Sequence, residues 1–403
     1  MLIVQKFGGT SVGDLERIQN VASRIAKTKR AGNDVVVVVS AMSGETNKLV
    51  DYAQHFSKTP ARAEMDMLLS SGERVTASLL SIALQEMGLK SCSMTGRKAG
   101  IKTNKHHTKA RIEEINPQNM TNELADGKVV VVAGFQGVDG NGDVTTLGRG
   151  GSDLSAVAIA GALKADLCEI YTDVNGIYTT DPRIEPKARK IEKISYDEML
   201  EFASLGAKVL QNRSVEMAKK LNVNLVTRSS FSDEEGTLIT KEENIMEEPL
   251  VSGIALDRNQ ARVSLCGVKD RPGIASDIFN RLADADVNVD MIIQTKAIDD
   301  TTNIDFTVPV NELDDAKAVV NTFVQNGEIK SDSYNNNICK VSVVGVGMKS
   351  HAGVAAKAFS VMAEENININ MISTSEIKIS MVIDEKYAEL AVRSLHDAYE
   401  LEK

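Results

Sequence analysis

The hydrophobic positions of this chain follow two different patterns, and the change from one to the other falls near residue 240. Before that point, short apolar runs occur at 2–7, 34–40, 128–134 and 166–172. The run at 34–40, DVVVVVS, is almost entirely β-branched, as is typical of a parallel strand buried on both faces. Between the runs, apolar residues recur three and four positions apart, which predicts helices. Alternating strands and helices predict an α/β domain with a mainly parallel, right-handed wound sheet.

End signals and apolar spacing place the other elements of this first region. The first helix runs to about Arg30, and Asp14 or Ser11 is its candidate N-cap. A later helix is expected to be capped by Ser152 or Asp153. The dipeptides at 139–142, Asp-Gly and Asn-Gly, are typical of hairpin turns. Further helices are expected at 61–87, 152–165, 195–207 and 209–221, and further strands at 91–95 and 223–226.

The region beyond residue 250 contains an internal repeat. Each of its two units reads β-α-β-β-α, and VNVDMI in the first unit matches ININMI in the second. A ferredoxin-like βαββαβ module needs a fourth strand, which 331–338 supplies to the first unit. The second unit ends with the chain, so its missing strand must come from elsewhere, and 251–256 has no other obvious partner. The first module is therefore predicted to be inserted into the second.

These patterns divide the chain into one large domain and two small ones. The acidic stretch KEENIMEEP, which has few apolar residues, is expected to be a linker. The predicted boundaries are a first domain at 1–240, a linker at 241–249, a first small module at 262–338, and a second small module made of 250–261 and 339–403.

Composition excludes several classes of protein. A net charge of −10 in 403 residues argues against nucleic acid as a partner. No run of about 18 apolar residues predicts a membrane span, and no signal peptide is recognisable at the start. Four cysteines lie far apart and are expected to be reduced, buried thiols, neither paired nor binding zinc. Together these features predict a cytoplasmic globular protein.

The turn after the first strand carries the clearest candidate chemistry. Lys6 is followed by Gly8 and Gly9, and a Gly-rich turn aimed at a helix N-terminus is suited to binding a phosphate. The two common phosphate motifs are absent, because Asp14 and Leu15 stand where a P-loop needs Lys and Ser or Thr, and no G-x-G-x-x-G occurs at this turn. Ligands of wound sheets lie beyond strand C-termini, so the loops after residues 7, 40, 134 and 172 are candidate binding loops.

Motifs along the whole chain resemble those of the amino-acid kinase family, and of aspartate kinases in particular. In order they are KFGGTS, SAMSGETN, SGERVT, TTLGRGGSD, YTDVNGIYTTDPR and LEFASLGAKVL, followed by DRPGIA and MISTSEIKIS. The resemblance implies a catalytic domain of the amino-acid kinase fold and a C-terminal tandem pair of ACT domains, which bind amino acids. It implies ATP-dependent phosphorylation of the side-chain carboxylate of L-aspartate to 4-phospho-L-aspartate, the first step of lysine, threonine and methionine biosynthesis.

The resemblance also implies residue roles. A carboxylate nucleophile needs no general base, so phosphoryl transfer requires mainly positioning and positive charge. The implied catalytic residues are Lys6, Asp153 and Lys208. The implied ATP site comprises Lys6, Gly8, Gly9, Thr10, Ser40, Tyr171, Thr172, Asp173, Tyr178, Asp181, Arg183 and Lys208. The implied aspartate site comprises Thr46, Glu73, Arg149, Gly150, Gly151 and Ser152.

Several of these residues keep alternatives from the sequence alone. Glu73 would, without a ligand, be a surface charge on its helix, and GRGGSD a flexible loop. Asp153 either caps its helix or orients Lys6 and the reacting groups. Lys208 would, on spacing alone, be an exposed helix lysine. Magnesium is implied by the use of ATP and is expected to reach the protein mostly through phosphates, so no protein ligands are assigned to it.

The ACT pair implies feedback inhibition by lysine, threonine or both. The implied effector contacts are Asp270, Ile274, Ala275, Asn288, Asp290 and Gln294 in the first module and Asn368, Ile369 and Thr374 in the second. The second module has Ala352 where the first has Pro272, which loosens a pre-set turn. A homo-oligomer formed through the ACT domains is expected, with a shorter regulatory chain starting at Met246 as a further option.

Two other functions compete with this interpretation. An acetylglutamate kinase would also phosphorylate a carboxylate, but the ACT pair and the SGER and GRGGSD motifs argue against it. A non-catalytic amino-acid sensor would not need Lys6, Arg149, Asp153 and Lys208. ATP turnover with L-aspartate, with N-acetyl-L-glutamate or with neither discriminates the three.

Overall fold

The computed structural model describes residues 1–204, 209–245, 250–296, 300–351 and 353–403. The chain forms two compact units, and each is described by itself. The first unit comprises Met1–Ile177, Lys190–Ser204 and Lys208–Glu247, and the second comprises Tyr178–Arg189, Leu205–Ala207 and Glu248–Lys403. The segment Tyr178–Arg189 therefore belongs with the C-terminal part of the chain, although it lies within the predicted first domain.

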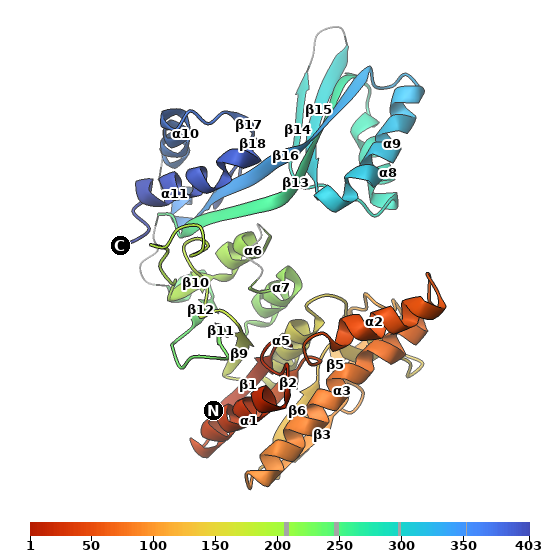
Figure 1. The fold of residues 1–403 in the computed structure, drawn as a ribbon, viewed down its shortest axis with the longest axis vertical. Coiled ribbons are helices and arrows are strands. Elements are labelled where there is room, and N and C mark those ends of the chain that lie inside the picture. The colour runs from red at the N-terminus through yellow and green to blue at the C-terminus, as the bar shows by residue number, and fades with distance from the viewer. Residues whose placement is uncertain (205–208, 246–249, 297–299, 352) are drawn as a thin grey trace. The chain divides into compact units, whose positions relative to one another are not determined.

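An eight-stranded sheet forms the centre of the first unit (Figure 1). Its neighbours are parallel except for β11 and β12, which run antiparallel. The mainly parallel sheet predicted from the sequence is confirmed, whereas β10 and β12 were not expected. In order across the sheet, the strands are β10 (Lys193–Ser195), β12 (Thr237–Thr240), β11 (Leu225–Ser229), β9 (Leu167–Thr172), β1 (Leu2–Phe7), β2 (Asp34–Val39), β6 (Val129–Ala133) and β3 (Ser91–Met94).

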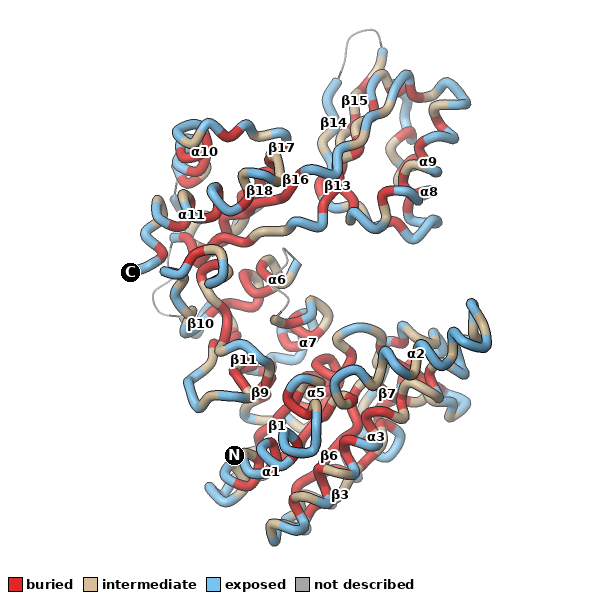
Figure 2. The backbone as a smooth tube through the Cα atoms, in the orientation of Figure 1, coloured by how far each residue is buried: buried red, intermediate tan, exposed pale blue. Residues whose placement is uncertain are grey.

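Helices cover the sheet because its strands are apolar on both faces. Val35, Val37 and Val39 of β2 pack in one cluster with α1 (Leu15–Arg30) and α3 (Arg62–Glu86). Alternate side chains point to opposite faces of a sheet, so Val36 and Val38 face the other way. α5 (Gly151–Leu163) packs against β1, β2 and β9, and α7 (Asn212–Leu221) packs against α5. The buried strands appear red between the helices in Figure 2.

Of the two candidate N-caps of α1, Asp14 and Ser11, the cap is Asp14, which accepts a hydrogen bond from the N–H of Arg17 at 2.8 Å. The predicted cap of α5 is wrong. This helix follows Gly150 in the left-handed conformation without a side-chain cap, and Ser152 and Asp153 already lie in its first turn. Two other helices, α2 (Glu45–Phe56) and α4 (Gln118–Ala125), were not predicted, and α6 spans Tyr196–Ser204.

A second, four-stranded sheet in the first unit was also not predicted. Its order is β5 (Ile112–Ile115), β4 (Ile101–Thr103), β7 (Gln136–Val138) and β8 (Val144–Thr146). β7 and β8 form an antiparallel hairpin whose turn contains the Asp-Gly and Asn-Gly dipeptides, so the predicted turn is confirmed.

The second unit is built on a six-stranded antiparallel sheet shared by the two repeats. Its order is β14 (Ile292–Lys296), β15 (Thr301–Val308), β13 (Gly253–Lys269), β16 (Ser331–Val344), β18 (Lys378–Asp384) and β17 (Ile369–Thr374). The two central strands are long. Gly253–Asp257 pairs with Lys340–Val344 beside β18, whereas Arg262–Cys266 pairs with Ser331–Asn335 in the half that contains β15.

Each half of this sheet has its own pair of helices and its own core. α8 (Ile274–Asp284) and α9 (Leu313–Gln325) pack with Val263, Leu265 and Phe306. α10 (Val354–Glu364) and α11 (Ala388–Ala398) pack with Val341, Val343 and Met381. Short 3₁₀ helices lie at η1 (Glu242–Asn244), η2 (Val310–Glu312), η3 (Val346–Ser350) and η4 (Glu385–Tyr387).

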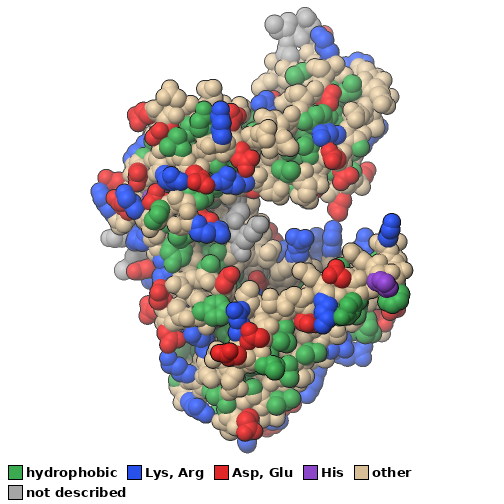
Figure 3. All heavy atoms as spheres, viewed as in Figure 1, with side chains coloured by type: hydrophobic (Ala, Val, Ile, Leu, Met, Phe, Trp, Pro, Cys, Tyr) green, Lys and Arg blue, Asp and Glu red, His purple; other side chains and the backbone are tan. Residues whose placement is uncertain are grey.

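Surface features agree with the composition. Acidic and basic side chains are interspersed over the face shown in Figure 3. Among the described helices, none is long and apolar enough to cross a membrane. All four cysteines are free, but only Cys168 and Cys339 are buried; Cys266 is exposed and Cys92 is partly exposed. The expectation of four buried thiols is therefore wrong for the last two.

Candidate active site

A cavity of about 420 Å³ in the first unit gathers residues from the loops after β1, β2 and β6 and from the start of α5. Three of the four loops expected to bind ligands therefore contribute to one cavity, because parallel strands end at the same edge of a sheet. Its lining includes the following predicted site residues: Lys6, Gly9, Thr10, Ser40, Thr46, Glu73, Arg149, Gly150, Gly151, Ser152 and Asp153.

Lys6 and Asp153 form an ion pair in this cavity. Lys6 Nζ lies 2.6 Å from Asp153 Oδ1, and both residues are 8% exposed. β1 carries the lysine and the first turn of α5 carries the aspartate, so the packing of α5 on β1 brings the two together. Of the two roles open for Asp153, the geometry favours orientation of Lys6. An ammonium held in place among backbone N–H groups is suited to a phosphate.

Glu73 is a buried carboxylate with an unused oxygen. Its Oε1 accepts a hydrogen bond from the N–H of Ala41 at 3.0 Å, whereas its buried Oε2 has no partner within the described part of the chain. Burial raises the pKa of Glu73 to about 7, while the Ala41 hydrogen bond acts in the opposite direction. An acceptor of this kind, aimed into a cavity, is suited to a cationic ligand group.

Arg149 supplies the opposite charge on the same cavity. Its side chain is exposed and has no ion pair or hydrogen bond among the described residues. The flanking Gly150 has φ +69°, and a Cβ there would lie 2.0 Å from Cγ of Gln211. Only glycine fits this position, so the loop that carries Arg149 can lie against the segment before α7.

The glycine turn after β1 offers fewer free donors than the sequence suggests. The N–H of Gly8 donates to the carbonyl of Tyr171 at 3.3 Å and so continues the pairing of β1 with β9. The N–H groups of Gly9 and Thr10 have no such partner within the described residues, and both residues line the cavity. Backbone donors for an anion therefore come from Gly9 and Thr10.

The residues implied for adenine and ribose do not line this cavity. The ring of Tyr171 stacks on Phe7 with centroids 4.5 Å apart, and its hydroxyl donates to Glu169 at 3.1 Å. Thr172 donates to Asp173 at 3.1 Å. Tyr178, Asp181 and Arg183 belong to the second unit, where Arg183 and Asp181 form an ion pair at 2.7 Å. Lys208 lies outside the described residues.

The predicted effector residues lie on the second unit. In the first module, two of them, Asn288 and Asp290, already have protein partners. The N–H of Asn288 donates to Glu312 at 2.6 Å. Asp290 forms an ion pair with Lys340 of β16, a lysine that is only 3% exposed. Asp270 and Gln294 are exposed, Ala275 is partly exposed, and Ile274 is buried.

In the second module, Ile369 and Thr374 lie on β17 and Asn368 precedes it. Gln294 on β14 and Thr374 on β17 therefore occupy the two edge strands of the six-stranded sheet.

The helix starts of the two modules are alike despite the missing proline. Gly273 before α8 has φ +93°, and Gly353 before α10 has φ +96°. Ala352 lies outside the described residues.

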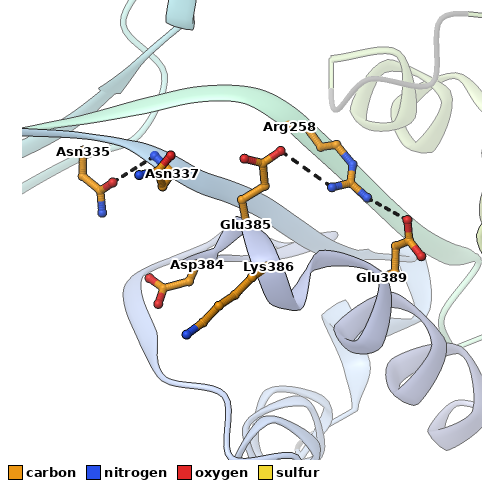
Figure 4. A pocket seen from close by; sticks show the side chains of 7 residues that line it. All are labelled: Arg258, Asn335, Asn337, Asp384, Glu385, Lys386 and Glu389. Carbon is orange, nitrogen blue, oxygen red and sulfur yellow. Dashed lines mark hydrogen bonds and ion pairs between the residues drawn. The ribbon is translucent and has the colours of Figure 1, made fainter.

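A second cavity, of about 640 Å³, lies in the second unit beside α11 and none of the predicted effector residues lines it. Arg258 of β13 points toward Glu385 and Glu389, with N–O distances of 3.7 and 3.2 Å (Figure 4). Because the arginine is already paired with both carboxylates, we assign no ligand to this cavity.

Two residues of the active-site region were missed in the sequence. Phe135 lines the cavity and has φ +69°, an unusual conformation for a non-glycine residue, and its N–H donates to Ser155 at 3.1 Å. Gln211 packs against Gly150. Phe135 directly follows the candidate loop position at Gly134, a signal that could have been used, whereas nothing in the local sequence marks Gln211.

The described residues contain no group of three or more His, Cys, Asp or Glu side chains that could hold a metal ion. Asp153 is engaged by Lys6, and Glu73 stands alone as a carboxylate on its side of the cavity. This donor set fits a magnesium ion carried mainly by phosphate oxygens and water.

Comparison with known proteins places these features in a family context. The amino acid kinase family matches residues 1–228, and ACT domains match residues 262–328 and 341–399. Aspartokinase from Helicobacter pylori is 58% identical over 407 residues, covering 100% of both chains. Two crystal structures of E. coli aspartokinase III are each 27% identical to this chain. The complex with aspartate and ADP (R-state) has a TM-score of 0.82, and the match covers 99% of both chains. The complex with lysine and aspartate (T-state) has a TM-score of 0.80, and the match covers 98% of this chain and 99% of that chain.

Proposed function

The chain belongs to the amino acid kinase family, and within it to the aspartokinases, and from this premise we propose how its cavity phosphorylates L-aspartate. The reaction transfers the γ-phosphoryl group of ATP to the side-chain carboxylate of aspartate and yields 4-phospho-L-aspartate. The observation that carries the proposal is the arrangement of three charges on one cavity. An unpaired Arg149, a buried Glu73 with a free oxygen and the Lys6–Asp153 pair all line it.

In this proposal the substrate binds through its α-groups. The Arg149 guanidinium holds the α-carboxylate bidentately, and Glu73 accepts from the α-ammonium. The hydroxyls of Thr46 and Ser152, on the same cavity, add hydrogen bonds. The two protein charges match the two charges of an amino acid, and the side-chain carboxylate is left to react.

The phosphoryl acceptor is already ionised at neutral pH, so no residue has to remove a proton. A carboxylate oxygen of aspartate forms a bond to the γ-phosphorus while the bond to the β–γ bridging oxygen breaks, and that electron pair leaves with ADP. Lys6 and the N–H groups of Gly9 and Thr10 stabilise the negative charge on the phosphoryl oxygens. Asp153 keeps the Lys6 ammonium in place through the ion pair.

We propose Ser40 and Gly8 as further contacts of the nucleotide and Lys208 as the second lysine on the phosphate side. Tyr171, Thr172, Asp173, Tyr178, Asp181 and Arg183 are proposed to meet adenine and ribose. Because the ring of Tyr171 lies in the core, its part would be through the backbone. Magnesium would supply charge neutralisation on the phosphates, held mainly by phosphate oxygens and water.

The second unit is proposed to be regulatory, with lysine, threonine or both as effectors. The ACT matches and the exposed edge strands β14 and β17 support this and support a homo-oligomer built through the sheet edges.

For the domain boundaries we propose a catalytic domain at 1–240, a linker at 241–249, a first ACT module at 262–338, and a second ACT module made of 250–261 and 339–403. The strand pairing of β13 and β16 supports insertion of the first module into the second. Action in the cytoplasm is proposed from the four free cysteines.

The test is Arg149→Ala, compared with Arg149→Lys and with Arg62→Ala, an exposed arginine of the same unit that does not line the cavity. Loss of the carboxylate contact should cost about 2 kcal/mol or more, roughly thirtyfold in kcat/KM for aspartate. The KM for ATP should change little. The kcat/KM of Arg149→Lys for aspartate should lie between those of wild type and Arg149→Ala, because lysine keeps the positive charge but cannot bind a carboxylate bidentately. A normal aspartate KM in Arg149→Ala would show that the assignment is wrong.

A further inference from the structure

Asp66 is a fully buried carboxylate, on the inner face of α3, that the reaction itself does not use. It accepts hydrogen bonds from the ring Nδ1 of His107 at 2.8 Å and from the N–H of Thr108 at 3.0 and 3.1 Å. It also accepts from the hydroxyl of Thr146. Burying a carboxylate is costly unless it is well hydrogen-bonded, so these contacts hold the groups around Asp66 firmly.

The groups that Asp66 binds belong to two segments that adjoin the Arg149 loop. Thr146 is the last residue of β8, directly before the loop 147–150. Thr108 is held with φ +67°, and its carbonyl oxygen lies 3.2 Å from where a Cβ of Gly148 would be. The N–H of Ala110 donates to the carbonyl of Thr146 at 2.9 Å, which joins the two segments directly.

A second set of hydrogen bonds ties the same loop to α7. The guanidinium of Arg213, in α7, donates to the carbonyls of Leu147 at 2.6 Å and Ala110 at 3.1 Å. The loop that carries Arg149 is therefore tied at its base by a carboxylate from α3 and by an arginine from α7.

Asp66 also shares its helix with Glu73. The two are seven residues apart, which is two helical turns or about 10 Å along α3, and both are buried on one face. The same rigid element thus presents Glu73 to the cavity and holds the base of the Arg149 loop.

We propose that Asp66 is a positioning residue that sets the separation between Arg149 and Glu73, and so the fit of the cavity to the α-carboxylate and α-ammonium of an amino acid. This inference rests on the proposed roles of Arg149 and Glu73. An exposed arginine on a glycine loop has many rotamers, and a fixed loop base limits where its guanidinium can go. The hydrogen-bond partners of Asp66 are His107, Thr108 and Thr146, and none of these three is among the residues proposed to contact the nucleotide.

The test uses Asp66→Asn and, as a milder variant, Thr146→Val, which keeps the buried carboxylate and loses one hydrogen bond. The matched control is Glu198→Gln. Glu198 is 2% exposed, accepts from the N–H of Ser195 at 3.1 Å and from its hydroxyl at 2.8 Å, and does not line the cavity. We expect the KM for aspartate to rise roughly tenfold or more in Asp66→Asn and severalfold in Thr146→Val, with the KM for ATP within about twofold of wild type.

A double-mutant cycle with Arg149→Ala separates positioning from general damage. If Asp66 acts through Arg149, Asp66→Asn and Thr146→Val should raise the KM for aspartate much less when Arg149 is already alanine. The inference is overturned if the aspartate KM of Thr146→Val stays at the wild-type value, or if the KM for ATP rises together with the KM for aspartate. It is also overturned if the effects of Asp66→Asn and Arg149→Ala on the aspartate KM are fully additive. The proposed function fails separately, through a normal aspartate KM in Arg149→Ala alone.

Discussion

At the scale of single residues, the cavity contains two buried carboxylates with different surroundings. Asp153 lies against the Lys6 ammonium at 2.6 Å, so its charge has a partner. The Glu73 carboxylate accepts a hydrogen bond from Ala41 but has no cationic partner among the described residues, and burial raises its pKa to about 7. A carboxylate without a cation is poised to accept one from a ligand.

Aspartate binding should therefore depend on pH through Glu73. Only the ionised carboxylate attracts an ammonium, so the KM for aspartate should fall as pH rises through about 7 and level off above pH 8. Binding should also release protons near pH 7, because the ammonium lowers the pKa of Glu73. Calorimetry in buffers of different ionisation enthalpy measures this release. It should vanish in Glu73→Gln, and an unchanged proton release in that variant would contradict the assignment.

The protein should become less stable as pH rises, although aspartate binding becomes tighter over the same range. The pKa of Glu73 in the folded state, about 7, lies above the 4.5 of an ordinary glutamate, so between these pH values the folded state holds a proton that the unfolded state has lost. Stability is therefore lost as pH rises from about 4.5 to 7. Glu73→Gln removes the ionisable group and should raise the free energy of unfolding at pH 8 by up to about 3 kcal/mol. Urea denaturation of wild type and variant at pH 5 and pH 8 checks this, and equal differences at both pH values would contradict it.

At the scale of elements, α11 holds a segment that lies far from it in sequence. The buried ring of His396 bonds through Nε2 to the hydroxyl of Thr179 at 2.9 Å. Arg393 donates to the carbonyl of Ile184 at 3.0 Å, and Lys187 forms an ion pair with Asp397 at 3.5 Å. The segment Tyr178–Arg189, which contains three residues proposed to meet the nucleotide, is thereby fastened to the last helix of the regulatory unit.

This attachment should weaken in acid. Burial lowers the pKa of His396, although Glu185, Asp397 and Glu402 oppose the shift and Lys187 adds to it. The detached state then binds more protons than the attached state, so the attachment loses stability as pH falls below about 6.5. Hydrogen exchange of residues 178–189, corrected for intrinsic rates, should be faster relative to α10 at pH 5.5 than at pH 7.5. His396→Gln, which cannot titrate, should remove the difference; a pH effect that survives in this variant would refute the role of His396.

At the scale of the whole molecule, the two ACT modules form a single sheet because β13 and β16 run through both. Lys340, buried in β16, reaches Asp290 and so links the sheet to the proposed effector region. A small cluster of Met291, Ile338, Met371 and Val382 packs across the same junction. An effector ammonium that bound Asp290 would compete with Lys340, which gives the ligand a means of shifting the balance between two states of the unit.

Feedback inhibition should follow from this arrangement. Activity is to be titrated with lysine, threonine and both together, in wild type and in Gln294→Ala. The variant should stay active but lose sensitivity, since coupling of about 1–3 kcal/mol is comparable to one ligand contact. Thr295→Ala is the control, because its side chain points to the other face of β14. Wild-type activity unchanged by millimolar lysine, threonine or both would refute the regulatory assignment without affecting the catalytic one.

The sequence by itself determined the features that depend on neighbouring residues. The valines of β2, the Asp14 cap of α1 and the hairpin turn at 139–142 were predicted because burial and backbone conformation leave a local periodic signal. The repeat beyond residue 250 and the motif order were enough to indicate the family.

Only the tertiary structure decided which distant side chains meet. It placed Asp153 against Lys6 instead of at a helix cap, turned the ring of Tyr171 into the core, and joined Asp66 to Thr108 and Thr146. It also buried Glu73, which raises the pKa of this carboxyl, and left one of its oxygens without a partner among the described residues. Such pairings and shifts depend on how β-strands and helices pack, and packing between distant segments leaves no periodic mark in a single sequence.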